Sequence, residues 1–212
     1  MTTYKDFNDV PKGQFSVILA DPDWEFKTYS QKGKDKSPDK HYLTPTTPAQ
    51  EIASHPVKDM IHPDGAVLFL WCTWPHIFSA KEVIEGWGFQ YSGLAFEWIK
   101  RNPATGKYAI GGGYGTRKNV ECLLMGRTPN FKLTKRIKNR STRDILFAAK
   151  REHSRKPDEQ YKIIENLFDG PYLELYARQN WPGWHSAGNE VDKFEVTPEH
   201  AEMIRNTELL LP

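Results

Sequence analysis

Cysteine is scarce in this sequence, since only Cys72 and Cys122 occur among 212 residues. Two isolated cysteines build neither a disulfide framework nor a zinc cage. Long apolar runs are also missing, and the longest, from Ala66 to Cys72, is far shorter than the ~20 residues that span a membrane. The N-terminal residues are polar and do not resemble a signal peptide. These absences predict a soluble protein of the cytoplasm that makes no membrane contact.

Net charge is low as well, at +2, but the basic residues are concentrated in one segment. Residues 127–156 contain eleven lysines and arginines against two acidic residues, which is a net charge of +9 and leaves −7 on the remainder. A basic block on an otherwise acidic chain is typical of a surface that binds a polyanion. A solvated basic loop is the alternative, and charge alone does not separate the two.

Short apolar runs alternate with helical patterns along the chain. The apolar runs predict strands at 15–20, 66–72, 89–100, 119–125 and 172–177. The helical patterns predict helices at 48–60, 75–87 and 157–168, with a short amphipathic helix and a Leu209–Leu211 tail after Val191. This alternation predicts a single α/β domain over residues 1–212, with a mostly parallel sheet flanked by helices.

Two expected loops and the strand ends are the places to look for function. The polar segment 25–47 and the glycine-rich segment 101–118 are long enough to be substrate loops. The three glycines at 111–113 have no following Gly-Lys-Ser/Thr, which excludes a phosphate-binding P-loop. In α/β sheets, ligands bind beyond the carboxyl ends of the strands, so the residues that follow each strand are the candidates.

The first strand is followed by Asp21-Pro22-Asp23-Trp24. An aspartate and a backbone carbonyl of the proline turn can accept hydrogen bonds from the amino group of a flat ring, and Trp24 can stack on that ring at ~1–3 kcal/mol per base. Such bonds turn the nitrogen lone pair toward a methyl donor, and alignment supplies the rest of the catalysis. An ordinary turn followed by a core tryptophan is the alternative.

Several blocks in fixed order resemble the family of the eukaryotic mRNA adenosine methyltransferase catalytic subunit. The blocks are ADPDW (20–24), HYLT (41–44), GAVLFLWCT (65–73), WGF (87–89), GYGTRKNVECLLMGR (113–127), REHSRKPDEQYKIIENLF (151–168), LELYAR (173–178) and PGWHSAGNEV (182–191). The bacterial and phage DNA adenine methyltransferase branch is the most similar, because the chain has no long N-terminal extension. The resemblance implies a Rossmann-like methyltransferase fold with a circularly permuted motif order.

The resemblance also implies a cofactor, S-adenosylmethionine, which is released as S-adenosylhomocysteine, and no metal. It assigns Asp21 to catalysis and to the donor's amino group, and Lys156 to the donor's carboxylate. It implies that the ribose and adenine of the donor are contacted by residues at and after the last strand, namely Tyr176, Arg178, Asn189 and Glu190.

On the substrate side, the resemblance places Glu121 near the target adenosine, beside the Asp21 to Trp24 motif. A charge in the apolar strand 119–125 also favours a function on physical grounds, because burying it without one is costly. Arg117 and Lys118 are expected to contact phosphates, with a solvated surface as an equal alternative. His153 is given a structural role, since the chemistry needs no base.

Three functions remain open. The first is methylation of the exocyclic N6 amine of adenine in DNA, with a flipped or single-stranded target. The second changes the polymer to RNA. The third is a catalytically inactive nucleic-acid-binding subunit, which is favoured by Asp23 because the family usually has a second proline there. The sequence leaves monomer or dimer open.

Overall fold

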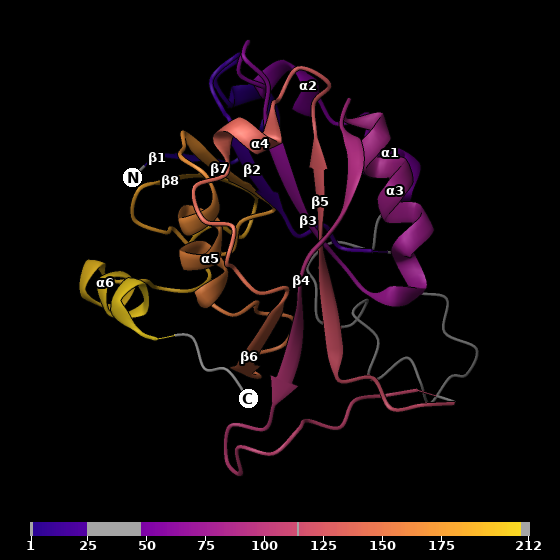
Figure 1. The fold of residues 1–212 in the computed structure, drawn as a ribbon, viewed down its shortest axis with the longest axis vertical. Helices are drawn as coiled ribbons and strands as arrows, with labels where there is room; N and C mark the ends of the chain where they lie inside the picture. The colour runs from indigo at the N-terminus through magenta and orange to yellow at the C-terminus, as the bar shows by residue number, and fades with distance from the viewer. Residues whose placement is uncertain (1, 25–47, 114, 209–212) are drawn as a thin grey trace.

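The computed structural model describes residues 2–24, 48–113 and 115–208, and Figure 1 shows one sheet between two layers of helices. The strands are β1 (Thr2–Tyr4), β2 (Val17–Ala20), β3 (Val67–Cys72), β4 (Gln90–Arg101), β5 (Val120–Arg127), β6 (Ile145–Ala149), β7 (Tyr172–Leu175) and β8 (Trp184–Ala187). The helices are η1 (Phe7–Asp9), α1 (Ala49–Ser54), α2 (Val57–Met60), η4 (Trp74–His76), α3 (Ile77–Gly86), α4 (Leu133–Arg136), α5 (Glu159–Leu167) and α6 (Pro198–Asn206). The expected loop 25–47, with the HYLT block, and the 209–211 tail lie outside the described residues.

The sheet has the strand order β1-β8-β7-β2-β3-β5-β4-β6. Every neighbouring pair is parallel except β3–β5 and β5–β4, in which β5 runs against its neighbours. The mostly parallel α/β sheet predicted from the sequence is therefore confirmed. Its central strands β2 and β3 are buried along their whole length, as strands covered on both faces must be.

Each face of the sheet packs against its own helices. On one face, apolar side chains of α1, α2 and α3 pack on alternate residues of β2 and β3 such as Ile18 and Leu68. On the other face, α5 and α6 cover residues such as Leu19 and Phe69. The helix expected after Val191 is α6, and its buried Ala201 and Ile204 make it part of this core. Among the described residues, no helix has the length and apolar character needed to cross a membrane.

The helix expected over residues 48–60 is wrong in one respect, because α1 and α2 are separate short helices. Pro56 follows His55, which is extended at φ −62° and ψ 147°. A residue before proline avoids the helical region, and proline has no N–H to continue a helix. The sequence reasoning also missed β1, β6 and β8, since they are short and β6 lies inside the basic segment.

Candidate active site

The candidate site lies at the carboxyl edge of the sheet, between β7 and β2. On one side of β2 the sheet continues with β3, β5, β4 and β6, where β5 is inserted between β3 and β4. The chain then returns through α5 and places β7 on the other side of β2. The strand order therefore reverses beside β2, and ligands of α/β sheets bind at such a reversal. Asp21 follows β2 at this position, and Tyr176 follows β7.

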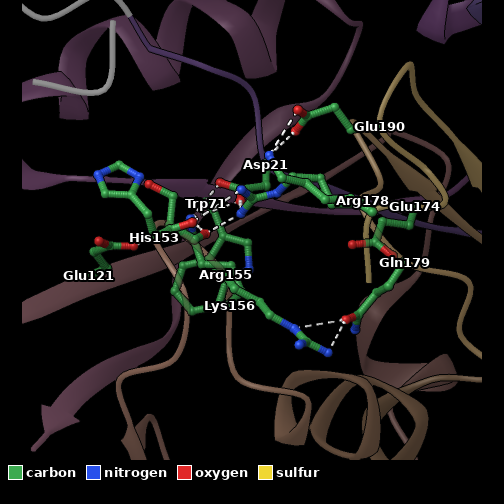
Figure 2. A network of polar contacts seen from close by, with 12 residues as sticks. Asp21, Trp71, Glu121, His153, Arg155, Lys156, Glu174, Arg178, Gln179 and Glu190 are labelled. Atoms are coloured by element: carbon green, nitrogen blue, oxygen red, sulfur yellow. Dashed lines mark hydrogen bonds and ion pairs between the residues drawn. The ribbon is translucent and has the colours of Figure 1, made fainter. Parts of the chain in front are cut away.

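A chain of alternating charges crosses this edge. The Lys156 Nζ lies 2.8 Å from a carboxylate oxygen of Asp21 and 3.4 Å from one of Glu121. Glu121 is in turn paired with Lys100, at the end of β4. Residues from β2, β4, β5 and the segment before α5 thus meet in one network, part of which Figure 2 shows. The structure brings together Asp21, Glu121 and Lys156, which the sequence had singled out separately.

The network keeps Glu121 ionised in spite of its burial. Burial alone would raise the pKa of Glu121, but attraction to Lys156 and Lys100 outweighs it and lowers this pKa below its ordinary value. Burial also lowers the pKa of the Lys100 ammonium, against the pull of Glu121. A buried carboxylate held by two ammonium groups is costly unless the pairing is kept. Loss of either lysine would therefore change the charge of the site.

A hollow with about 290 Å³ of space, including its open mouth, adjoins Asp21 and Lys156. Its lining residues come from the ends of β2 and β7 and from the segments around α5 and after β8; they are Asp21, Arg155, Lys156, Gln160, Tyr161, Glu174, Tyr176, Arg178, Gln179 and Phe194. The Arg178 guanidinium lies 3.9 Å from Asp21 and 5.7 Å from the centre of the Phe194 ring. The hollow therefore offers both charges and an aromatic wall to a ligand.

Glu174 on β7 supplies a second carboxyl to this hollow, opposite Glu121 in Figure 2. It is buried and accepts a hydrogen bond of 2.8 Å from the Tyr161 hydroxyl. Burial raises the pKa of Glu174 to about 8, and the charge of Asp21 acts in the same direction. Unlike Glu121, this carboxyl has no ammonium partner among the described residues and is protonated over much of the neutral range.

Tyr176 turns the chain sharply where β7 ends. Its φ of 59° lies in the left-handed region, which an L-residue adopts only when the surroundings impose it. Its hydroxyl is buried and has no hydrogen-bond partner among the described residues. Beside it, a Cβ on Gly188 would come within 2.8 Å of the Ala177 carbonyl oxygen, so the ends of β7 and β8 approach as closely as glycine allows. Strained backbone of this kind is typical of functional sites.

The two predicted residues after Gly188 differ in their environments. Asn189 is exposed beyond the end of β8. The Glu190 side chain is largely buried and accepts hydrogen bonds of 2.8 Å from the Lys193 ammonium. Neither residue lines the hollow as the remaining cofactor candidates do. They lie at its β8 side, next to the turn that contains Tyr176.

Trp24 is a core residue, which is the alternative to an open stacking platform that the sequence left open. Its ring is 6% exposed, and its Nε1 donates a hydrogen bond of 2.9 Å to the Trp71 carbonyl. One ring face lies against His76, with ring centres 5.8 Å apart. Pro22 is buried too, whereas Asp21 and Asp23 are half-buried. Trp24 therefore anchors the motif to β3, and it is not presented as an open stacking platform.

The basic segment 127–156 does not form one surface, which corrects the simplest interpretation of its charge. Arg136 pairs with Asp64 and Lys138 with Asp169, both at the amino edge of the parallel strands. Lys156 lies at the opposite edge, and Figure 1 shows α4 far from the end of β6. Strand β6 carries the chain from one edge to the other, so only the end of the segment reaches the candidate site.

The other predicted contacts lie outside the hollow. Arg117 and Lys118 are exposed on the 101–118 loop, so the structure does not bring them to the hollow. His153 contributes its carbonyl oxygen, which accepts a hydrogen bond of 3.4 Å from Arg178.

Three charged residues of the site, Glu174, Lys100 and Arg155, were not predicted from the sequence. Glu174 stands in the apolar run LELYA, and the burial argument that selected Glu121 would have selected it as well. Lys100 is the penultimate residue of β4 and lies near Glu121 on the paired strand, but a lysine near a strand end has no distinctive signal without the strand register. Arg155 and Gln179, hydrogen-bonded to each other, are also visible only in the fold.

The site can hold a small molecule that carries both an ammonium and a carboxylate group. The Asp21 carboxylate is an acceptor for a cation, while Lys156 and Arg178 are donors for an anion. The Phe194 ring in the lining is available to the rest of such a ligand. A methyl donor built on an amino acid and a nucleoside fits these features, by the chemistry of the lining residues.

Comparison with known proteins agrees with this chemistry. The MT-A70 family model matches residues 15–190. The chain is 28% identical to the Type II methyltransferase M.MunI of Mycoplasma sp, over 94% of this chain and 88% of that protein. It is 30% identical to a probable N(6)-adenosine-methyltransferase MT-A70-like protein of Oryza sativa subsp. japonica, over 88% of this chain and 24% of that protein. It is 28% identical to the N(6)-adenosine-methyltransferase catalytic subunit METTL3 of Homo sapiens, over 85% of this chain and 29% of that protein.

Proposed function

This chain belongs to the MT-A70 family of adenine-N6 methyltransferases, with their Rossmann-like fold, and we propose that it methylates the N6 amine of adenine in DNA. Methyltransferases of this family use S-adenosylmethionine. One observation carries the proposal: the Asp21 carboxylate, at the switch point of the sheet, is held by Lys156 beside a hollow of mixed charge. The matching bacterial Type II methyltransferase is covered over 88% of its length, which supports DNA over RNA.

The donor would be held by the residues around the hollow. Lys156 and Arg178 would bind its carboxylate side, and Asp21 its amino group. Tyr176, Asn189 and Glu190, at the ends of β7 and β8, would contact its ribose and adenine. The opposite charges of Asp21 and Lys156 suit an amino-acid zwitterion, which supports this assignment.

The target adenine would lie on the other side of Asp21. The Asp21 carboxylate and the backbone carbonyl of Pro22 would accept hydrogen bonds from the N6 amine, which orients its lone pair. When bound, S-adenosylmethionine would supply an electrophilic methyl group to N6, with the C–S electron pair left on sulfur and one N6 proton passing to solvent. Glu121, across Lys156 from Asp21, would border the adenosine.

Polymer binding would use groups outside the hollow. Arg117 and Lys118 are exposed cations on the 101–118 loop and would contact phosphates. Trp24 would hold the motif in place through its bond to β3. We also propose that residues 1–212 act as one domain, in the cytoplasm of a bacterial or phage-infected cell.

The decisive experiment supplies labelled S-adenosylmethionine to the protein with DNA and with RNA in parallel, and then identifies the product nucleoside. N6-methyladenine in DNA is the expected product. Product only in RNA would replace DNA by RNA as the substrate. Product in neither polymer would contradict catalysis and favour the inactive nucleic-acid-binding subunit, for which Asp23 is the motif's departure.

A matched pair of variants tests the site itself. Asp21→Asn keeps the shape of the side chain and removes its charge, so activity should fall at least a hundredfold. Asp64→Asn makes the same change at an exposed position at the opposite edge and should leave activity unchanged. Circular dichroism of both variants verifies their folding.

A further inference from the structure

The loop at residues 101–118 presents two apolar side chains to solvent. Tyr108 is 60% exposed and Ile110 is 79% exposed, while Ala109 between them is buried. Residues that alternate in this way along an extended segment point to opposite sides, so Tyr108 and Ile110 leave the chain on the same side. Figure 1 shows that this loop extends past the ends of β4 and β5, away from the helices.

The position of these side chains is set by β4. The Ala109 N–H donates a 2.8 Å hydrogen bond to the Lys100 carbonyl, and the Asn102 N–H donates one of 2.8 Å to the Lys107 carbonyl. Arg101 and Tyr108 form an antiparallel bridge, which continues the edge of the strand. Tyr108 therefore stands on an ordered turn, and its exposure is not the result of an unattached loop.

Positive charge surrounds the two apolar side chains. The 101–118 segment contains four basic residues and no acidic residue. The Arg101 guanidinium lies between the Tyr108 and Phe147 rings, at 6.0 and 4.9 Å from their centres, and its buried Nε has no hydrogen-bond partner among the described residues. Arg101 has no acidic partner among the described residues, so its guanidinium can bind an external anion such as a phosphate.

The loop begins next to a residue of the charge network at the proposed site. Arg101 follows Lys100, which belongs to the chain of charges that runs through Glu121 and Lys156 to Asp21. The base of the loop is therefore connected to the proposed site through this chain of charges. A duplex requires an additional step compared with a single strand, because its target base must leave the stack before it can reach Asp21.

We propose that Tyr108 and Ile110 form a wedge that enters a DNA duplex beside the target adenine, while Arg101 holds a flanking phosphate. Apolar side chains inserted between base steps unstack them, and an aromatic ring takes over the stacking that the extruded base provided. The inference rests on the proposed function and adds the residues that open the duplex. It also commits the enzyme to double-stranded substrate.

The test compares one DNA preparation in native and in heat-denatured form, with labelled methyl incorporation as the readout. Tyr108→Ala and Ile110→Ala, singly and together, are set beside Tyr91→Ala, which changes an exposed tyrosine at the other end of β4. The double variant should methylate native DNA about tenfold more slowly, which corresponds to about 1.4 kcal/mol. Its rate on denatured DNA should stay within about twofold of the wild type. Tyr108→Phe keeps the ring and should restore most of the rate on native DNA.

The outcomes separate the wedge from the function on which it rests. Equal decreases on both DNA forms would assign Tyr108 and Ile110 to general binding and overturn the wedge, as would an unchanged double variant. A wild-type enzyme that methylates only RNA or only denatured DNA would overturn the wedge while adenine methylation stands. A wild-type protein that transfers no methyl group to any polymer would overturn both. Unchanged affinity of the variants for S-adenosylmethionine, measured by calorimetry, shows that the site is intact.

Discussion

Lys156 is the single residue on which most of the site's electrostatics depends. Its ammonium touches Asp21 and Glu121, and those two carboxylates would face each other without a cation between them if it were removed. Leaving a partly buried carboxylate without its partner is more costly than losing an exposed pair. The same ammonium is proposed to bind the donor's carboxylate.

Replacing Lys156 with methionine should therefore weaken S-adenosylmethionine binding by about a hundredfold. This decrease corresponds to the loss of roughly two charge-assisted hydrogen bonds. Isothermal titration calorimetry measures the change directly. Lys12→Met, which removes an exposed cation paired with Asp59, is the control and should bind like the wild type. Undiminished affinity of Lys156→Met would show that the carboxylate binds elsewhere.

Glu174 makes stability depend on pH in an identifiable direction. Its pKa is raised from 4.5 to about 8 in the folded chain, so the folded state keeps a proton that the unfolded state has already released between these values. Stability must then fall as pH rises through this window, because the unfolded state binds fewer protons. The neutral carboxyl is the form that suits this buried position.

Glu174→Gln should remove that fall, since glutamine is neutral throughout. Relative to the wild type, the variant should be more stable at pH 8 than at pH 5, as measured by urea unfolding at several pH values. Glu85→Gln, on the exposed surface of α3, serves as the control for general charge effects. Parallel pH profiles for Glu174→Gln and the wild type would show that Glu174 ionises normally.

At the scale of elements, the antiparallel strand β5 depends on a glycine to pack under α3. A Cβ on Gly126 would lie 2.9 Å from the Ile84 Cγ2 and 3.2 Å from the Phe89 Cβ. Both neighbours belong to the core, so they cannot move aside freely. Since β5 joins β3 to β4, this contact also sets the distance of α3 from the half of the sheet that contains Glu121.

Gly126→Ala should lower the free energy of unfolding by about 1–3 kcal/mol, the usual cost of overpacking a core. Chemical denaturation gives the value. Gly112→Ala provides a matched control, because a Cβ there meets nothing within 4 Å, and its stability should be equal to or slightly above that of the wild type. Equal stability of the two variants would mean that the α3 contact is looser than described.

Over the whole molecule, the basic residues at the amino edge and at the carboxyl edge of the sheet differ in their ion pairing. At the amino edge, Arg136 and Lys138 are paired with acidic side chains. At the carboxyl edge, Arg117 and Lys118 make no ion pair with any described residue. DNA affinity should therefore respond to the carboxyl edge and not to the net charge of the chain.

The double variant Arg117→Ala with Lys118→Ala should bind DNA more weakly and with a shallower salt dependence, by about 0.9 in log–log slope for each phosphate that the protein no longer neutralises. Fluorescence anisotropy over a salt series measures both quantities. Lys132→Ala with Lys135→Ala removes the same charge near α4 and should leave the slope unchanged. A similar decrease in slope for both pairs would mean that DNA extends over both edges.

The fold class, most strand and helix positions and the family could all be predicted from the amino-acid sequence alone. Those features depend on local patterns: apolar runs, proline and glycine positions, and short blocks in order. The sequence also singled out Asp21, Glu121 and Lys156 individually. Elements can be predicted in this way because the pattern that specifies each one is short-range. The His55-Pro56 pair shows that a single local feature can still divide a predicted helix.

Which of these residues contact one another is visible only in the folded structure. Lys156 reaches Asp21 across 135 positions of sequence, and Glu174 and Lys100 join them through the register of β7 and β4. The folded structure also divided the basic segment between two edges and buried Trp24 against β3. Side-chain contacts and burial depend on the order of the strands in the sheet. That order follows from packing both faces of the sheet at the same time, and a local sequence pattern does not contain this information.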